Sequence, residues 1–138
     1  MLTFHTEDLN FELDNTKKVE QWILQIIENE GGTLSFINYI FCSDTYLHRI
    51  NVEYLNHDTY TDIITFPYSD ETIESDIFIS IDRIRENAKT FNVTFERELH
   101  RVMIHGVLHL LGYGDKTEEE QKRMRAREDF WLERKTIF

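Results

Sequence analysis

Residues 102–115, VMIHGVLHLLGYGD, form the stretch that decides the fold of this chain. From Val102 to Leu111 the only ionisable side chains are His105 and His109, and nearly all the other residues are apolar. Such a run predicts a buried helix, on which residues four positions apart share one face, with Cβ atoms roughly 5–6 Å apart. Buried imidazoles need polar partners, and one shared metal ion supplies a partner to both.

Gly112 is placed to end this helix as a left-handed cap, so that Asp115 can return as a third ligand. The pattern reads H-x-x-x-H-x-x-G-x-x-D. Three protein ligands leave a fourth position for water, as in catalytic zinc sites. We therefore predict that His105, His109 and Asp115 hold one divalent ion, Zn²⁺ in the first place and another divalent metal otherwise. The alternative is two core histidines that bond to backbone carbonyls or carboxylates.

The remaining elements surround this helix in one predicted domain, residues 1–138. The expected strands, rich in β-branched and aromatic residues, are residues 2–5, 33–42, 61–68 and 77–80, with residues 11–13 as a possible continuation or partner of the first. Five helices are expected. The first is capped by Asn15 or Thr16 and ends at Asn29, the second is capped by Asp44 and ends near Leu55, and the third runs from Ser80 or Asp82 to about Phe91. The histidine helix begins after Thr94, and the last helix begins at a capping box formed by Thr117 and Glu120. The fold class expected is α/β (α+β), a small mixed four-stranded sheet packed by helices, with a zincin-like metal helix.

The composition limits which partners the protein can bind and where in the cell it can be located. The 138 residues carry a net charge of −11, which argues against non-specific binding to a polyanion. The first residues, MLTFHTEDLN, have neither the basic start nor the apolar core of a signal peptide, and no apolar run approaches the ~18 residues of a membrane span. The single cysteine, Cys42, fits a reducing compartment. We expect a cytoplasmic protein without membrane contact, in which Cys42 is a small core residue.

The histidine helix also resembles a known family. Its spacing is similar to that of the zincin proteases, but Gly106 stands where H-E-x-x-H carries its glutamate base. Residues 105–113, HGVLHLLGY, resemble the signature of the YbeY family of ribosomal-RNA maturation factors, in which that glycine is expected. Residues 61–67, TDIITFP, and 75–80, SDIFIS, are similar to two further family motifs in the same order, so the likeness covers roughly residues 44–130.

This resemblance implies a metal-dependent, single-strand endoribonuclease that acts in maturation of ribosomal RNA (the 16S 3′ end) and in ribosome quality control. It also implies zinc as cofactor and the small ribosomal subunit as partner. The third ligand of the family is usually a histidine, so His105 and His109 carry over directly and Asp115 carries over by substitution. The family usually has a catalytic arginine where this chain has Leu55. We expect His57 to supply that donor on the rim of the metal cavity; the alternative is an exposed loop histidine.

Two other functions stay open on the sequence. The first is an aspartate-zincin metalloprotease, against which the missing glutamate argues. The second is a non-catalytic ribosome-assembly factor with a structural metal, which a closed shell of four ligands would favour.

A nuclease of this net charge must place its few cations near the site, so we expect its metal cleft to be less negative than the rest of its surface. Because this positive surface is small, we expect its affinity for bare RNA to be weak. The candidate cations are Arg83, Arg85 and Lys89 in one cluster and Lys122, Arg123, Arg125 and Arg127 in another. The alternative for both clusters is a solvated helix face with ion pairs four residues apart. Tyr60 and Tyr113 are candidates for stacking on bases, with rim or core packing as the alternative.

Overall fold

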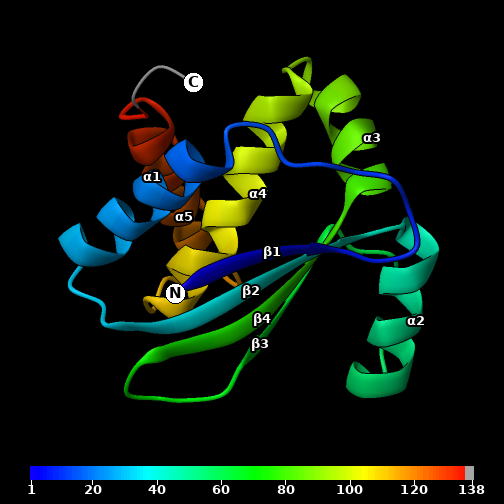
Figure 1. Cartoon of the computed structure of the whole chain (residues 1–138), viewed down its shortest axis with the longest axis horizontal. Helices are drawn as coiled ribbons and strands as arrows, with labels where there is room; N and C mark the ends of the chain where they lie inside the picture. Colours follow the sequence, from blue (N-terminus) through cyan, green and yellow to red (C-terminus); the bar gives the residue numbers. More distant parts are fainter. Residues whose placement is uncertain (136–138) are drawn as a thin grey trace.

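Four strands and five helices make up the part of the chain that the structure, a computed structural model, describes: residues 1–135 (Figure 1). The strands are β1 (Leu2–Thr6), β2 (Leu34–Cys42), β3 (Ile63–Pro67) and β4 (Ile73–Ser80). They form one sheet in the order β1-β2-β4-β3, in which β1, β2 and β4 run parallel and β3 pairs antiparallel with β4. The predicted mixed four-stranded sheet is therefore confirmed.

The helices cover both faces of this sheet unequally. They are α1 (Thr16–Asn29), α2 (Asp44–Leu55), α3 (Ile81–Phe91), α4 (Phe95–Leu110) and α5 (Glu118–Leu132). Figure 1 shows α1, α3, α4 and α5 on one side of the sheet and α2 on the other. Because side chains alternate across a strand, Ile77 and Ile79 of β4 join the main core, whereas Phe78 packs with the smaller cluster that contains Leu47 of α2. The fold is the single mixed α/β domain that the sequence predicts.

The helix starts follow their capping signals with two corrections. Asn15 stands at the N-cap position of α1, but its side chain makes no capping hydrogen bond, and the Thr16 hydroxyl donates instead to the carbonyl of Leu13. Thr94 caps α4, and the Thr117–Glu120 capping box at the start of α5 is complete. Helix α2 is capped by Ser43 and not by Asp44, because the Ser43 hydroxyl accepts the hydrogen bond from the backbone N–H of Tyr46. A hydroxyl that accepts an orphan N–H of the first turn is the usual function of a helix cap.

Two strand predictions need correction. Strand β4 begins at Ile73, four residues earlier than the sequence indicates, and residues 11–13 form no strand. Phe11 instead packs its ring 5.1 Å from that of Phe41 and 6.0 Å from that of Phe95. The apolar residues of this segment therefore cover the core as a loop. Cys42 is buried in the smaller cluster, as predicted.

Helix α4 lies at the centre of the helical layer and packs closely on the sheet. Its buried apolar residues are Leu99, Val102, Met103, Ile104, Val107 and Leu108. Gly106 marks the closest approach, because a Cβ atom there would lie 3.0 Å from Cδ1 of Ile63 and 3.2 Å from Cδ1 of Ile77. The absence of a side chain at Gly106 therefore lets α4 pack closely on β3 and β4.

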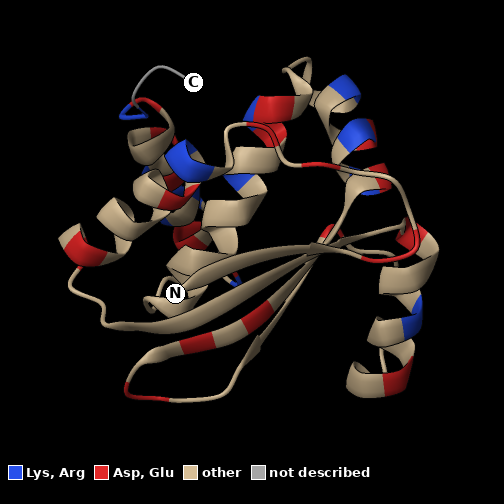
Figure 2. Ribbon diagram, in the orientation of Figure 1, with Lys and Arg blue, Asp and Glu red and all other residues tan. Residues whose placement is uncertain are grey.

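Charge is distributed unevenly over the fold. The β3–β4 hairpin carries acidic residues and no basic ones, as Figure 2 shows in red. Helix α3 and helix α5 carry most of the basic residues near the helical layer, interleaved with acidic ones. Within residues 1–135, no helix has the length and apolar character needed to cross a bilayer.

Candidate metal centre

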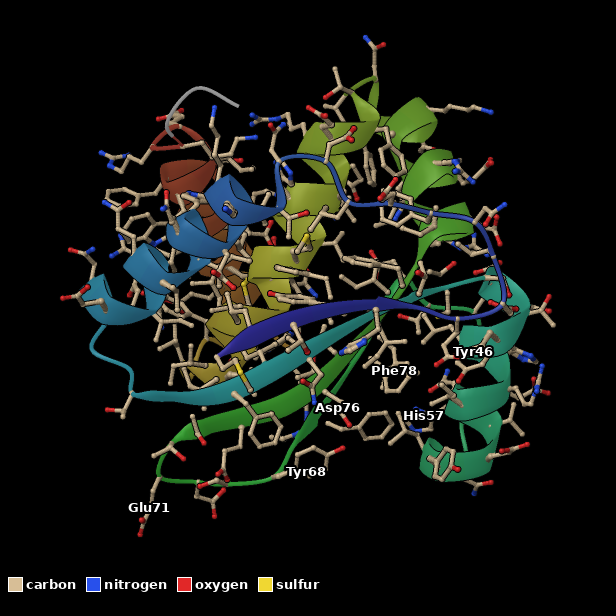
Figure 3. The ribbon with its side chains drawn as sticks, viewed as in Figure 1. Tyr46, His57, Tyr68, Glu71, Asp76 and Phe78 are labelled. Atoms are coloured by element: carbon tan, nitrogen blue, oxygen red, sulfur yellow. The ribbon has the colours of Figure 1, made fainter. Side chains whose placement is uncertain are left out.

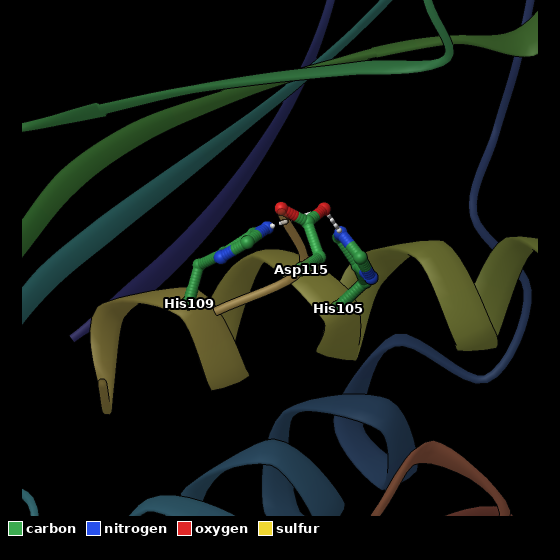
Figure 4. Close-up of side chains that lie close together, drawn as sticks. All are labelled: His105, His109 and Asp115. Carbon is green, nitrogen blue, oxygen red and sulfur yellow. Dashed lines mark hydrogen bonds and ion pairs between the residues drawn. The ribbon is translucent and has the colours of Figure 1, made fainter. Parts of the chain in front are cut away.

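Three side chains from one helix and the loop after it converge at the edge of the sheet (Figure 4). His105 and His109 project from α4, and Asp115 follows it. Oδ2 of Asp115 lies 3.3 Å from Nε2 of His105 and 3.2 Å from Nε2 of His109. One ligand atom from each of the three residues lies within 4.8 Å of the other two. The geometry thus brings together the three residues that the sequence predicts as ligands; their binding of a metal stays a prediction.

The end of α4 explains how Asp115 returns to the helix that precedes it. The N–H of Tyr113 donates to the carbonyl of Leu108, and the N–H of Gly112 donates to that of His109. These two bonds form the Schellman arrangement, which needs a left-handed residue after the last helical turn. Gly112 has φ = +104° and meets that need at little cost. The reversal turns the loop so that Asp115 faces the two histidines.

Each imidazole is oriented through its Nδ1 atom. Nδ1 of His109 lies 2.9 Å from the carbonyl oxygen of Tyr113, which can only accept, so this nitrogen donates its proton. Nδ1 of His105 donates to the carboxylate of Glu128 across 2.6 Å. A neutral imidazole protonated at Nδ1 presents a lone pair at Nε2. Both Nε2 lone pairs therefore face Asp115, as a shared cation requires.

Glu128 belongs to a buried ionic network behind His105. Its side chain is 1% exposed, and Arg101 bridges it to Glu98: Arg101 donates to Glu128 at 3.1 Å and to Glu98 at 2.9 and 2.7 Å. Burial by itself raises the pKa of Glu128, but the hydrogen bond from His105 and the charge of Arg101 outweigh it and lower that pKa. Glu128 is thus a carboxylate that holds His105 from α5.

Sequence reasoning missed this network. Glu98 and Arg101 lie three residues apart on one helix, a spacing that predicts an ion pair, but a surface pair would have been the ordinary interpretation. Glu128 sits in the charged run KRMRARED, where nothing distinguishes it from its neighbours. Only the packing of α5 on α4 brings it to His105.

The three converging residues open onto a cavity of about 530 Å³ between α4 and β3. Leu55, at the end of α2, and His57, just beyond it, also line this cavity. His57 is exposed, and Figure 3 labels it beside α2. His57 therefore lines the predicted cavity, and its function as a donor to the substrate stays a prediction. Among residues 1–135, no Lys or Arg lines this cavity. Asp62 also lines it, and burial raises the pKa of its carboxyl group.

Most residues of the two predicted cation clusters lie away from the metal cavity. Arg83 pairs with Asp44 at 2.8 Å, and Arg127 pairs with Glu30 at 2.6 Å, so both engage structural partners away from the cavity. Arg125 alone among the two predicted cation clusters lines a second cavity beside His105.

The two candidate tyrosines also lie outside the metal cavity. Tyr60 is exposed and stacks on His48, with ring centroids 4.2 Å apart. The hydroxyl of Tyr113 donates to Glu30, which fits the rim or core packing that the sequence left as an alternative.

The donor set fits a divalent transition metal. Two imidazole nitrogens and one carboxylate oxygen are ligands that zinc accepts. Their outer partners, a carboxylate for His105 and a carbonyl for His109, are those that metal-bound histidines usually have. The cavity leaves one side of the three-residue site open.

Comparisons with known proteins show the family of this chain. Residues 1–136 match the family model described as Endoribonuclease YbeY. The chain belongs to the YbeY family. It is 51% identical over 130 residues to Endoribonuclease YbeY of Flavobacterium johnsoniae, covering 94% of this chain and 93% of the relative. It is 48% identical over 131 residues to the YbeY of Amoebophilus asiaticus, covering 94% and 89%.

A solved structure supports the fold of this YbeY family member. The solution structure of TM1509 from Thermotoga maritima aligns with a TM-score of 0.69 at 29% identity, covering 96% of this chain and 87% of that one. The resemblance seen in the sequence motifs is thus confirmed over the whole domain.

Proposed function

We propose that this protein is a metal-dependent endoribonuclease that hydrolyses single-stranded ribosomal RNA during its maturation. The observation that carries the proposal is the convergence of His105, His109 and Asp115, with both Nε2 atoms turned to one open cavity, in a chain of the YbeY family. The curated relatives are named endoribonucleases. Zn²⁺ is the proposed ion, because two imidazoles and a carboxylate with a fourth position open make up a catalytic zinc shell.

The residues of the chain have distinct parts in the proposed reaction. A divalent ion held in this site would supply Lewis-acid polarisation of a phosphoryl oxygen and would lower the pKa of a bound water molecule. His105, His109 and Asp115 hold that ion, and Glu128 and the Tyr113 carbonyl fix the two rings. His57, which lines the same cavity, is proposed to donate a hydrogen bond to the phosphate as negative charge develops on it.

The protease alternative is not favoured. Gly106 occupies the position of the zincin glutamate and packs against Ile63 and Ile77 of the sheet. A glutamate side chain would need the space that these two residues fill, so this face of α4 offers no room for the base that such proteases use. The family membership of the chain points the same way.

The assembly-factor alternative requires a structural ion. Structural zinc sites close a shell of four protein ligands, whereas catalytic sites keep a position open. Three candidate ligands lie together within residues 1–135, and the cavity of about 530 Å³ lies in front of them. An accessible site of this kind supports catalysis.

The partner proposed is the small ribosomal subunit in the cytoplasm, and residues 1–138 are proposed to act as one domain. A chain of net charge −11 whose metal cavity has no Lys or Arg in its described lining attracts bare RNA weakly. Presentation of the RNA by a ribosomal particle would supply the missing affinity. The single cysteine, which is buried, supports a reducing compartment.

The decisive experiment combines metal content with RNA cleavage. We expect purified protein to hold close to one equivalent of zinc, and to cleave a single-stranded ribosomal-RNA fragment before chelation but not after it. Added Zn²⁺ should restore cleavage, and a His105→Ala, His109→Ala double variant should lack both metal and activity. A casein substrate serves as the protease control. Cleavage that survives complete metal removal would refute the proposal, as would proteolysis without ribonuclease activity.

A further inference from the structure

The metal-site residues form a wall between two cavities. The first is the cavity of about 530 Å³ that His57 lines, and the second, of about 330 Å³, lies between α4 and α5. His105 and Asp115 line both of them. A chain-like substrate held at the metal site can therefore continue from one cavity into the other.

The two cavities differ in charge. No Lys or Arg within the described residues lines the first cavity, whereas Arg101 and Arg125 line the second. Glu128 lines the second cavity as well, and Asp115 lines both. The negative charges of these carboxylates therefore balance the positive charges of the two arginines. The second cavity becomes net positive only when a divalent cation adds its charge. An anionic group is held best on the α5 side of the metal, and only when the metal is bound.

The two arginines are not equivalent. The side chain of Arg101 is 13% exposed, and its donors are engaged by Glu98 and Glu128 at 2.7–3.1 Å. The side chain of Arg125 is 53% exposed, and its contact with Glu128 is long, 3.7 Å. The guanidinium of Arg101 is thus held by hydrogen bonds within the protein, whereas the guanidinium of Arg125 can turn toward a ligand. A guanidinium offers paired N–H donors that match two oxygens of one phosphate.

We propose that Arg125 is a phosphate-binding residue for the RNA substrate. The RNA strand crosses the wall formed by His105 and Asp115, with a nucleoside in the first cavity and an adjacent backbone phosphate against Arg125 in the second. The inference rests on the proposed function, because it identifies how the strand continues from the metal site. It also gives an acidic protein an exposed cation beside the metal site.

The test compares Arg125→Ala with Arg123→Ala in zinc-loaded protein. Arg123 is a matched control, because it is an exposed arginine on the same helix and lines neither cavity. The probe is a short single-stranded 2′-O-methyl phosphorothioate RNA, which resists hydrolysis, and its affinity is measured at several salt concentrations. We expect Arg125→Ala to weaken binding about ten-fold, the loss of one charge-assisted hydrogen bond. The slope of log affinity against log salt should flatten by about 0.7, one neutralised phosphate on a single strand.

Two further measurements keep the outcomes separate. Zinc affinity should be the same in wild type and Arg125→Ala, and Arg125→Lys should recover part of the lost RNA affinity because it keeps the charge. Equal losses in Arg125→Ala and Arg123→Ala would overturn the inference, and so would undetectable probe binding by wild type at low salt. A loss of zinc affinity in Arg125→Ala would overturn it as well, since Arg125 would then act through Glu128. RNA cleavage by wild type, measured in parallel, reports on the proposed function independently of these results.

Discussion

Nδ1 of His105 lies 2.6 Å from Oε2 of Glu128, a carboxylate 23 positions later in the chain that is 1% exposed. The bond fixes the ring of His105 and its tautomer together, because the proton on Nδ1 leaves the lone pair on Nε2. Arg101 holds the other oxygen of the same carboxylate at 3.1 Å. The orientation of one candidate ligand is therefore set by an interface between α4 and α5.

Replacement of Glu128 by glutamine should weaken zinc binding by about 10- to 100-fold, the usual loss when an outer partner of a metal-bound histidine is changed. The amide keeps the shape of the side chain but removes the charge that holds the Nδ1 proton. Competition with a chromophoric chelator measures the affinity, and ¹⁵N NMR of the imidazole reports the tautomer. Glu118→Gln, an exposed change on the same helix, is the control. Unchanged affinity and tautomer would remove Glu128 from the site.

Replacement of Asp115 tests whether its carboxylate binds the metal ion. We expect Asp115→Ala to lower zinc affinity more than about 100-fold, because it leaves two protein ligands where three are expected. Asp115→His should retain tight binding, since an imidazole at this position restores a third donor. Equilibrium dialysis with metal analysis measures both variants, and Asp70→Ala on the β3–β4 hairpin is the control. Tight zinc binding by Asp115→Ala would show that the carboxylate lies near the ion without binding it.

His57 is predicted to act on the substrate and not on the metal. His57→Ala should reduce kcat/KM for RNA cleavage about ten-fold, the loss of one hydrogen bond to a charged group, while the zinc content stays the same. His5→Ala, another exposed histidine, controls for general effects of the substitution. Cleavage at the wild-type rate by His57→Ala would return this residue to the category of exposed loop histidines.

Gly106 is predicted to be required by packing. Gly106→Ala should lower the free energy of unfolding by about 1–2 kcal/mol, because the strain of an added methyl group exceeds the gain in helix propensity. The nearest atom to the new Cβ would be Cδ1 of Ile63. Ile63→Val removes that atom, so the double variant should be more stable than the sum of the two single effects predicts. Urea unfolding measures this coupling, and strict additivity would contradict the proposed contact.

The stability of the fold should fall in acid through His100. Burial, with the nearby Lys135 charge, lowers the pKa of His100 to about 4. The unfolded chain takes up this proton near pH 6.5, whereas the folded protein does so only near pH 4. Stability is therefore complete above pH 6.5 and is lost as the pH falls from 6.5 toward 4, by on the order of 1–2 kcal/mol between pH 7 and pH 5. Urea unfolding of wild type and His100→Phe across this range should show a smaller pH dependence in the variant; equal dependence would contradict the assignment.

Much of the site could be predicted because its spacing is local. Two histidines one helical turn apart share a face whatever surrounds the helix, and Gly112 marks where the chain can reverse. The same locality explains why the caps at Thr94 and Thr117 could be predicted. The start of β4 could not, because Ile73 and its neighbours become a strand through their pairing with β2 and β3, and such pairing outweighs local propensity.

The sequence by itself determined the family, the layered α/β architecture and the three candidate ligands, two on one face of α4 and one in the loop that follows it. Only the tertiary structure decided which partners orient them. Glu128 is distant from His105 along the chain and reaches it through the packing of α5 on α4. In the same way, Ile63 of β3 packs against Gly106, and Arg125 of α5 lines a cavity beside His105. Local periodicity specifies which face a side chain occupies, but the neighbours of that face depend on how separate elements bury their apolar surfaces together.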